Sequence, residues 1–164
     1  MSFKTTPGER LRGFARYLPD ERSIIFVRDQ TDTEPIGLDR TSLDGALEFG
    51  TLTLIARTLD GRVLFPEGYH PRESWTEGTV PVPTFVSGSL YWEPAEDLIR
   101  GGALSVAEVI DIVTTFDPST GWIVIRLRAE DAKVDDRLDA VEFCDGVIAG
   151  VHGPRLVALW IRLR

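Results

Sequence analysis

Histidine, cysteine and carboxylate side chains carry most protein chemistry, and this chain holds few candidates of the first two kinds. It has two histidines, His70 and His152, and one cysteine, Cys144. Zinc and iron sites take three or more such ligands, so His70 and His152 would have to converge with a carboxylate such as Glu73. No phosphate-binding loop, nucleophile elbow or HExxH motif is present. The sequence therefore predicts no metal site, no cofactor and no catalytic residues, and favours a non-enzymatic role.

A Cys144–His152 nucleophile pair is the one catalytic arrangement that the spacing could suggest. Asp145-Gly146 is typical of a two-residue hairpin turn, and such a turn brings His152 opposite Asp139. At about 3.3 Å per residue, the imidazole then lies roughly 16 Å from the thiol. A nucleophile and its base must be within hydrogen-bond reach, so the strand geometry excludes this pair.

A second chemical feature is a strand-like sequence that occurs twice with few differences, as WIVIRLR from Trp122 and as LWIRLR ending at Arg164. The strand period of two puts aliphatic residues on one face and one tryptophan with two arginines on the other. If the two strands lie close in the sheet, these side chains form one patch, which is either a solvated face or a docking site for an acidic segment, a nucleotide or another anion. The patch would comprise Trp122, Arg126, Arg128, Trp160, Arg162 and Arg164.

Charge is distributed unevenly along the chain. The net charge is −8, and residues 67–117 alone carry −7, with nine carboxylates against two arginines. General nucleic-acid binding relies on basic surface that neutralises phosphates, so direct nucleic-acid binding is not expected.

The acidic middle of the chain also carries large aromatic rings, which supply much of the energy in protein interfaces. Clustered carboxylates steer a basic partner. The leading hypothesis is an acidic binding protein that masks a basic partner, as an immunity protein or an inhibitor of a toxin or nuclease would. The competing interpretation is that the carboxylates solvate a loop and the rings fill the core. The expected partner surface comprises Glu67, Tyr69, Glu73, Trp75, Glu77, Trp92, Glu93, Glu96 and Asp97.

Two short segments support an alternative function. RGFAR, with Arg12 and Arg16, and SLDGALEF, from Ser42, resemble the RxxxR and [D/N]xSxxG signature of PilZ domains, which bind cyclic di-GMP. The similarity covers about 35 residues, and Arg40 stands where the pattern has an acid, with Asp39 displaced by one. The resemblance implies a sensor domain that binds a small anionic ligand or nucleotide.

Strand patterns dominate the elements that must position these residues. Asp60-Gly61 predicts a hairpin in which Leu52, Leu54, Ala56, Val63 and Phe65 share one face. Residues 66–83, with four prolines, are expected to form a long loop. Further strands are expected at 23–28, 84–94, 121–129, 139–144, 147–152 and 155–164.

One amphipathic helix is expected at about 105–116. Ser105 and Glu108 match a capping box, and a stripe of β-branched residues has helical spacing. The predicted fold class is therefore α+β: a mostly antiparallel twisted sheet or open barrel with one main helix, in a single domain spanning 1–164. The chain shows no secretory signal and no apolar run long enough for a membrane span. A cytoplasmic location is expected.

Overall fold

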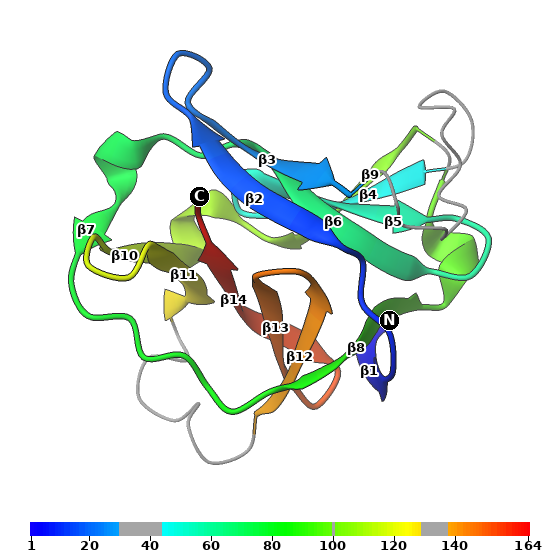
Figure 1. The fold of residues 1–164 in the computed structure, drawn as a ribbon. Helices are drawn as coiled ribbons and strands as arrows, with labels where there is room; N and C mark the ends of the chain where they lie inside the picture. Colours follow the sequence, from blue (N-terminus) through cyan, green and yellow to red (C-terminus); the bar gives the residue numbers. More distant parts are fainter. Residues whose placement is uncertain (30–43, 100, 129–137) are drawn as a thin grey trace.

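The computed structural model describes residues 1–29, 44–99, 101–128 and 138–164. Within these residues the protein is almost entirely β, with 62% in strands, 7% helical and no helix of seven or more residues. The strands form one mixed sheet that curls into a half-barrel (Figure 1). The predicted α+β class is therefore wrong.

Fourteen strands and three short 3₁₀ turns are present in the described residues. The strands are β1 (Ser2–Pro7), β2 (Gly13–Leu18), β3 (Ser23–Arg28), β4 (Asp44–Phe49), β5 (Leu52–Arg57), β6 (Arg62–Tyr69), β7 (Thr76–Glu77), β8 (Val86–Glu93), β9 (Ala103–Ala107), β10 (Ile112–Asp117), β11 (Trp122–Leu127), β12 (Asp139–Cys144), β13 (Val147–His152) and β14 (Arg155–Arg162). The turns are η1 (Arg72–Ser74), η2 (Ala95–Asp97) and η3 (Val109–Asp111).

The sheet follows the order β7-β10-β11-β14-β13-β12-β8-β6-β5-β4-β9. Strand β1 pairs with β8, and β2 pairs with β3, which in turn pairs with β6. Most neighbours are antiparallel; β10–β7, β12–β8 and β4–β9 are parallel. The concave side of the curl holds the main apolar core, to which β11 and β14 contribute Ile123, Ile125, Leu159 and Ile161.

The segment predicted as a helix forms β9, η3 and β10 instead. Ser105 Oγ does donate to Glu108 Oε1 at 3.0 Å, but no helix follows this contact. The segment is rich in β-branched residues, which lose side-chain freedom in a helix and pack well on a sheet. β9 extends the sheet beside β4, and β10 pairs along its whole length with β11. Sheet pairing thus overrides the local helical signal.

The proline-rich segment expected as a loop at 66–83 has a covering role. Its first part completes β6, and its last part continues into residues 78–85, which we term the strap. The strap crosses the convex face of the sheet, where Trp160 Nε1 donates to the Pro81 carbonyl oxygen at 3.1 Å. Val80 is buried there in a small apolar cluster with Val124, Ile148 and Trp160. Figure 1 shows the green trace of this segment running from β7 to β8 below β11–β14.

No helix in the described part of the chain is long and apolar enough to cross a membrane.

Candidate functional site

The two near-identical strands lie side by side. β11 and β14 pair antiparallel, so that Trp122 faces Arg162 and Val124 faces Trp160 across the ladder. Because side chains alternate along each strand, the tryptophans and arginines all lie on the convex face. The strap divides this face: Trp160 is only 8% exposed beneath it, whereas Trp122 is half-buried and Arg162 and Arg164 are exposed.

Strand β2 pairs along its whole length with β3, but the side of β2 that borders this face has no continuous ladder. Single bridges tie Leu11 to Cys144 and Ala15 to Leu163. Between them, the Gly13 amide donates to Asp145 Oδ2 at 3.0 Å instead of to a strand. Gly13 has a φ of +154°, and a Cβ there would lie 2.2 Å from the Val27 carbonyl oxygen. Glycine is therefore required where β2 leaves the ladder.

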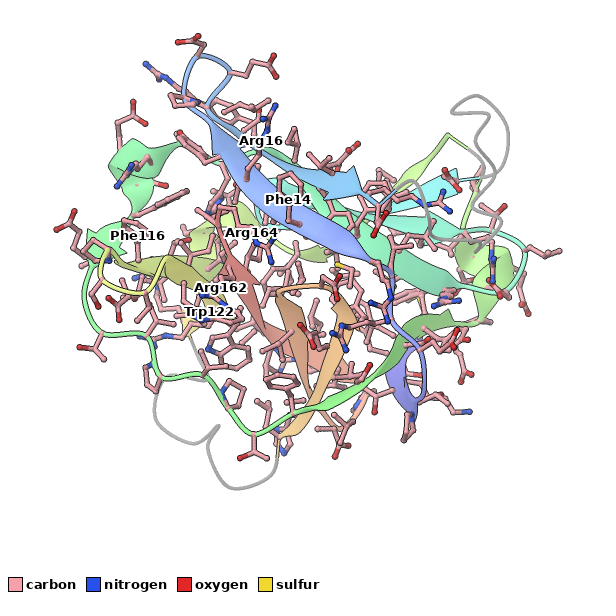
Figure 2. All side chains as sticks on the ribbon, in the orientation of Figure 1. Phe14, Arg16, Phe116, Trp122, Arg162 and Arg164 are labelled. Carbon is pink, nitrogen blue, oxygen red and sulfur yellow. The ribbon has the colours of Figure 1, made fainter. Side chains whose placement is uncertain are left out.

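A pocket of about 340 Å³ lies where β2 diverges, next to the Trp122–Arg162 pair. Figure 2 shows Phe14, Arg164, Arg162 and Trp122 following one another from β2 towards β11. The residues come from the β1–β2 connection, β2, the strap, β11, β12 with the turn that follows it, and the C-terminal end of β14. We term this the arginine–aromatic pocket; it is lined by Arg10, Gly13, Phe14, Phe85, Trp122, Glu142, Asp145, Gly146, Arg162 and Arg164.

Arg10 is held in place by carboxylates on the floor of the pocket. Its Nε lies 2.5 Å from Asp145 Oδ1 and 3.3 Å from Glu142 Oε2, and its Nη1 donates to Ser87 Oγ at 3.2 Å. The hydrogen bond to Asp145 raises the pKa of Arg10 above its ordinary value. Glu142 Oε1 also accepts from the Gly146 amide at 2.8 Å. These carboxylates position one arginine and the backbone of the turn.

Arg162 and Arg164 are in a different situation. Neither forms an ion pair with a carboxylate of the described residues. The Arg164 guanidinium lies 5.7 Å from the ring centroid of Phe14, a cation–π distance. Both guanidinium groups thus stand beside aromatic surface with their charge available to an anion.

The other two arginines of the expected patch lie away from the pocket. Arg126 faces Ala158 farther along the β11–β14 ladder. Arg128 Nη2 donates to the Ile112 carbonyl oxygen at 3.3 Å. The sequence-predicted patch is therefore brought together only in part: Trp122, Arg162 and Arg164 line the pocket, and Trp160 lies under the strap.

The expected partner surface is divided between two ends of the molecule. One group belongs to the end of β6, η1 and β7, at the left and upper left of Figure 1, and the other to the end of β8 and η2, at the right. The first group comprises Glu67, Tyr69, Glu73, Trp75 and Glu77, and the second Trp92, Glu93, Glu96 and Asp97. Nothing in this arrangement joins the nine residues into a single surface.

Several members of that set also have partners of their own. Trp92 is only 6% exposed and packs edge-on against Phe3, with a ring-centroid distance of 5.1 Å. Glu93 lies 3.5 Å from Lys4 Nζ, and Glu73 lies 3.5 Å from Arg22 Nε. Trp92 thus belongs to the core, and two of the carboxylates share their charge with cations.

Trp75 anchors η1 and β7 to the sheet rather than standing free. Its ring centroid lies 5.1 Å from that of Tyr17, 5.7 Å from Phe116 and 5.6 Å from His70. Arg72 lies over the Phe116 ring at 4.8 Å. Packing in this ring cluster therefore accounts for Trp75.

His70 is buried beside this cluster between two hydroxyl groups. Nδ1 lies 2.6 Å from Thr51 Oγ1, and Nε2 lies 3.0 Å from Thr114 Oγ1. Burial lowers the pKa of His70 to about 4. The neutral imidazole has a structural role here, with one ring nitrogen donating and the other accepting.

Cys144 and His152 do not form a catalytic pair. Cys144 is fully buried, which raises the pKa of its thiol, whereas His152 is exposed. A β-bulge between Glu142 and Cys144 shifts the register by one, so Asp139 faces Val151 instead of the predicted His152. No group of three or more His, Cys, Asp or Glu residues that could hold a metal ion occurs in the described ranges.

The PilZ-like residues are described only in part. Arg12 and Arg16 are exposed on or beside β2, and neither lines the arginine–aromatic pocket. Asp39, Arg40 and Ser42 lie outside the described residues.

Comparison with known proteins yields no matching family and no curated protein with significant similarity.

Of the ten residues that line the pocket, seven were not in the patch predicted from the sequence. Phe14 and Arg10 precede the repeated strands by more than a hundred residues, and no sequence pattern links them to Glu142 and Asp145. Phe85 lies at the end of the strap, whose path depends on Trp160. The Asp-Gly turn was the only available signal, because it predicted the hairpin that presents Asp145.

Proposed function

We propose that this protein binds a small organic anion in the arginine–aromatic pocket. The observation that carries the proposal is the cross-strand pairing of Trp122 with Arg162, which places a half-buried indole beside an arginine that has no carboxylate partner in the described residues. Arg164 adds a second such guanidinium two residues farther along. Arginine presents a planar fork of donors that matches carboxylate and phosphate groups.

The pocket is also built to hold its shape. Arg10, Glu142 and Asp145 are linked to one another and to the backbone amides of Gly13 and Gly146. Such a fixed polar network lowers the ordering cost of binding. The lining of the pocket combines three aromatic rings with convergent charged groups, and convergent polar groups fix the orientation of the ligand in small-molecule sites.

The hypothesis of a basic protein partner has less support. Its carboxylates are divided between two ends of the molecule, Glu73 and Glu93 are paired with cations, and Trp92 is buried. The concentrated negative charge expected from the sequence is thus spread over separate surfaces.

Calorimetric titration with phenyl phosphate and with benzoate tests the proposal. Saturable binding of either probe to the wild-type protein is expected, together with thermal stabilisation. The double substitution R162Q/R164Q should weaken binding by tenfold or more, since one charge-assisted hydrogen bond contributes about 1.5–3 kcal/mol. R155Q, at the other end of β14, is the matched control and should bind normally. The proposal fails if neither probe binds, or if R162Q/R164Q binds as tightly as R155Q.

A further inference from the structure

We infer that the ligand is a nucleoside 5′-monophosphate, a planar base carrying a single phosphate. This inference rests on the proposed function and specifies its ligand.

The pocket offers two kinds of binding group, positively charged arginines and aromatic rings, on different parts of its wall. Arg162 and Arg164 supply positive charge from the end of β14. Trp122, Phe14 and Phe85 supply ring surface from three separate segments, and Phe85 is 40% exposed. An inorganic anion would use only the arginines and a neutral aromatic only the rings. A ligand that uses both must carry a flat ring system and an anion a few atoms apart.

Stacking of a base on aromatic side chains suits the ring walls. Every nucleobase has a flat π-face, and stacking on one aromatic side chain strengthens binding about five- to hundredfold. Trp122 offers the largest ring of the three. Its backbone position is fixed by the β11–β14 ladder, in which it pairs with Arg162.

The size of the pocket limits the ligand to a single nucleotide. Its volume of about 340 Å³ lies at the lower end of the range for small-molecule sites, roughly 300–1,000 Å³. A dinucleotide, with two bases and two phosphates, would leave one half outside.

The charge balance of the pocket limits the number of phosphates. Three arginines face two carboxylates, Glu142 and Asp145, so the lining has an excess of one positive charge. The chain as a whole carries −8. A monophosphate, with a charge of about −2 at neutral pH, exceeds this excess by only about one, whereas a triphosphate would bring further negative charge that no other arginine of the lining neutralises.

The test compares a whole nucleotide with its two halves, using calorimetry on the full chain. AMP should bind at least tenfold more tightly than either ribose 5-phosphate or adenosine, and more tightly than ATP. Trp122→Leu should weaken AMP binding fivefold or more while leaving the affinity for ribose 5-phosphate within twofold. Phe85→Ser removes a more exposed ring of the pocket and should also weaken AMP binding, which keeps the test valid if Trp122→Leu disturbs the fold. Tyr69→Leu, which removes an exposed ring elsewhere, is the control.

The outcomes separate this inference from the proposed function. If ribose 5-phosphate binds as tightly as AMP, or ATP binds more tightly, the nucleotide inference is wrong while anion binding stands. If phenyl phosphate binds and neither AMP nor ribose 5-phosphate does, the ligand is another aromatic anion and the inference is also wrong. If none of these probes binds, both proposals fail together.

Discussion

Trp122 lies directly opposite Arg162 across the antiparallel ladder of β11 and β14. The pairing explains why the chain contains nearly the same strand twice: two adjacent strands with the same alternation give a sheet with one aliphatic face and one tryptophan–arginine face. The aliphatic face fills the core, with Ile123 and Ile161 both fully buried. The other face is shared between the strap and the pocket, so one sequence pattern supports both packing and a candidate site.

Gly13 should be among the least replaceable residues of the pocket. In Gly13→Ala, the new Cβ would lie 2.2 Å from the Val27 carbonyl oxygen and 2.8 Å from the Phe26 ring. We expect a loss of at least about 2 kcal/mol of unfolding free energy by urea denaturation. Gly153→Ala is the control: its φ is +58° but nothing lies within 4 Å, so about 1 kcal/mol is expected. Equal losses in the two variants would contradict this account.

Apolar runs bounded by turn or charged residues predicted the strands well, even though β13 is buried on both faces. The strands expected at 23–28, 139–144 and 147–152 have those bounds. Register was harder to predict because bulges are invisible in the pattern. A bulge between Ile55 and Ala56 pairs Val63 with Ala56 but Phe65 with Ile55. Phe65 is thereby turned to the face opposite the predicted one, where its ring stacks on Phe26 at 5.8 Å.

The helix prediction failed for an energetic reason. Val109 and Ile110 belong to the stripe of β-branched residues that a helix would have buried, yet they are 56% and 79% exposed. The sequence contains a local capping signal, but the extended segment forms ladder hydrogen bonds with β4 through β9 and with β11 and β7 through β10. The pocket was equally out of reach of local patterns, because Arg10 meets Glu142 and Asp145 only through the path of β2 along the β12–β13 turn.

Asp145→Asn should separate stability from ligand affinity. The change removes the charge that holds Arg10 at 2.5 Å, so the protein should lose about 1–3 kcal/mol of unfolding free energy. It also raises the positive charge of the pocket by one and releases Arg10 towards a bound anion, so phenyl phosphate should bind several-fold more tightly. Glu96→Gln, an exposed acid on η2, is the control for the change in net charge. Weaker binding by Asp145→Asn would argue against an anion in this pocket.

Trp160→Phe tests how the strap is attached. Phenylalanine keeps most of the buried ring but lacks the Nε1–H group that donates to the Pro81 carbonyl oxygen at 3.1 Å. A loss of about 1 kcal/mol is expected, together with faster hydrogen exchange at the Val80 amide, which donates to Asp117 Oδ2. Trp122→Phe is the matched control on the facing strand. Unchanged exchange at Val80 would show that apolar packing alone holds the strap.

His70 should make stability depend on pH in the mildly acidic range. Its pKa falls from 6.5 in the unfolded chain to about 4 in the folded protein because it is buried. Above about pH 6.5 both states are neutral. As the pH falls from 6.5 to 4, His70 binds a proton in the unfolded chain but stays neutral in the folded protein. The free energy of unfolding therefore decreases by roughly 3 kcal/mol over this range and then levels off.

Thermal or urea denaturation of His70→Gln between pH 4 and pH 7.5 isolates that contribution. Glutamine can still reach one of the two flanking hydroxyls, Thr51 or Thr114, but carries no titrating group, so the variant should be less stable at pH 7.5 and show a flatter pH profile below 6.5. His152→Gln removes the exposed histidine and should keep the wild-type slope. A His70→Gln profile as steep as that of the wild type would contradict this prediction. The loss of stability in acid would then come from carboxylates, and the pKa of the buried His70 would not be lowered.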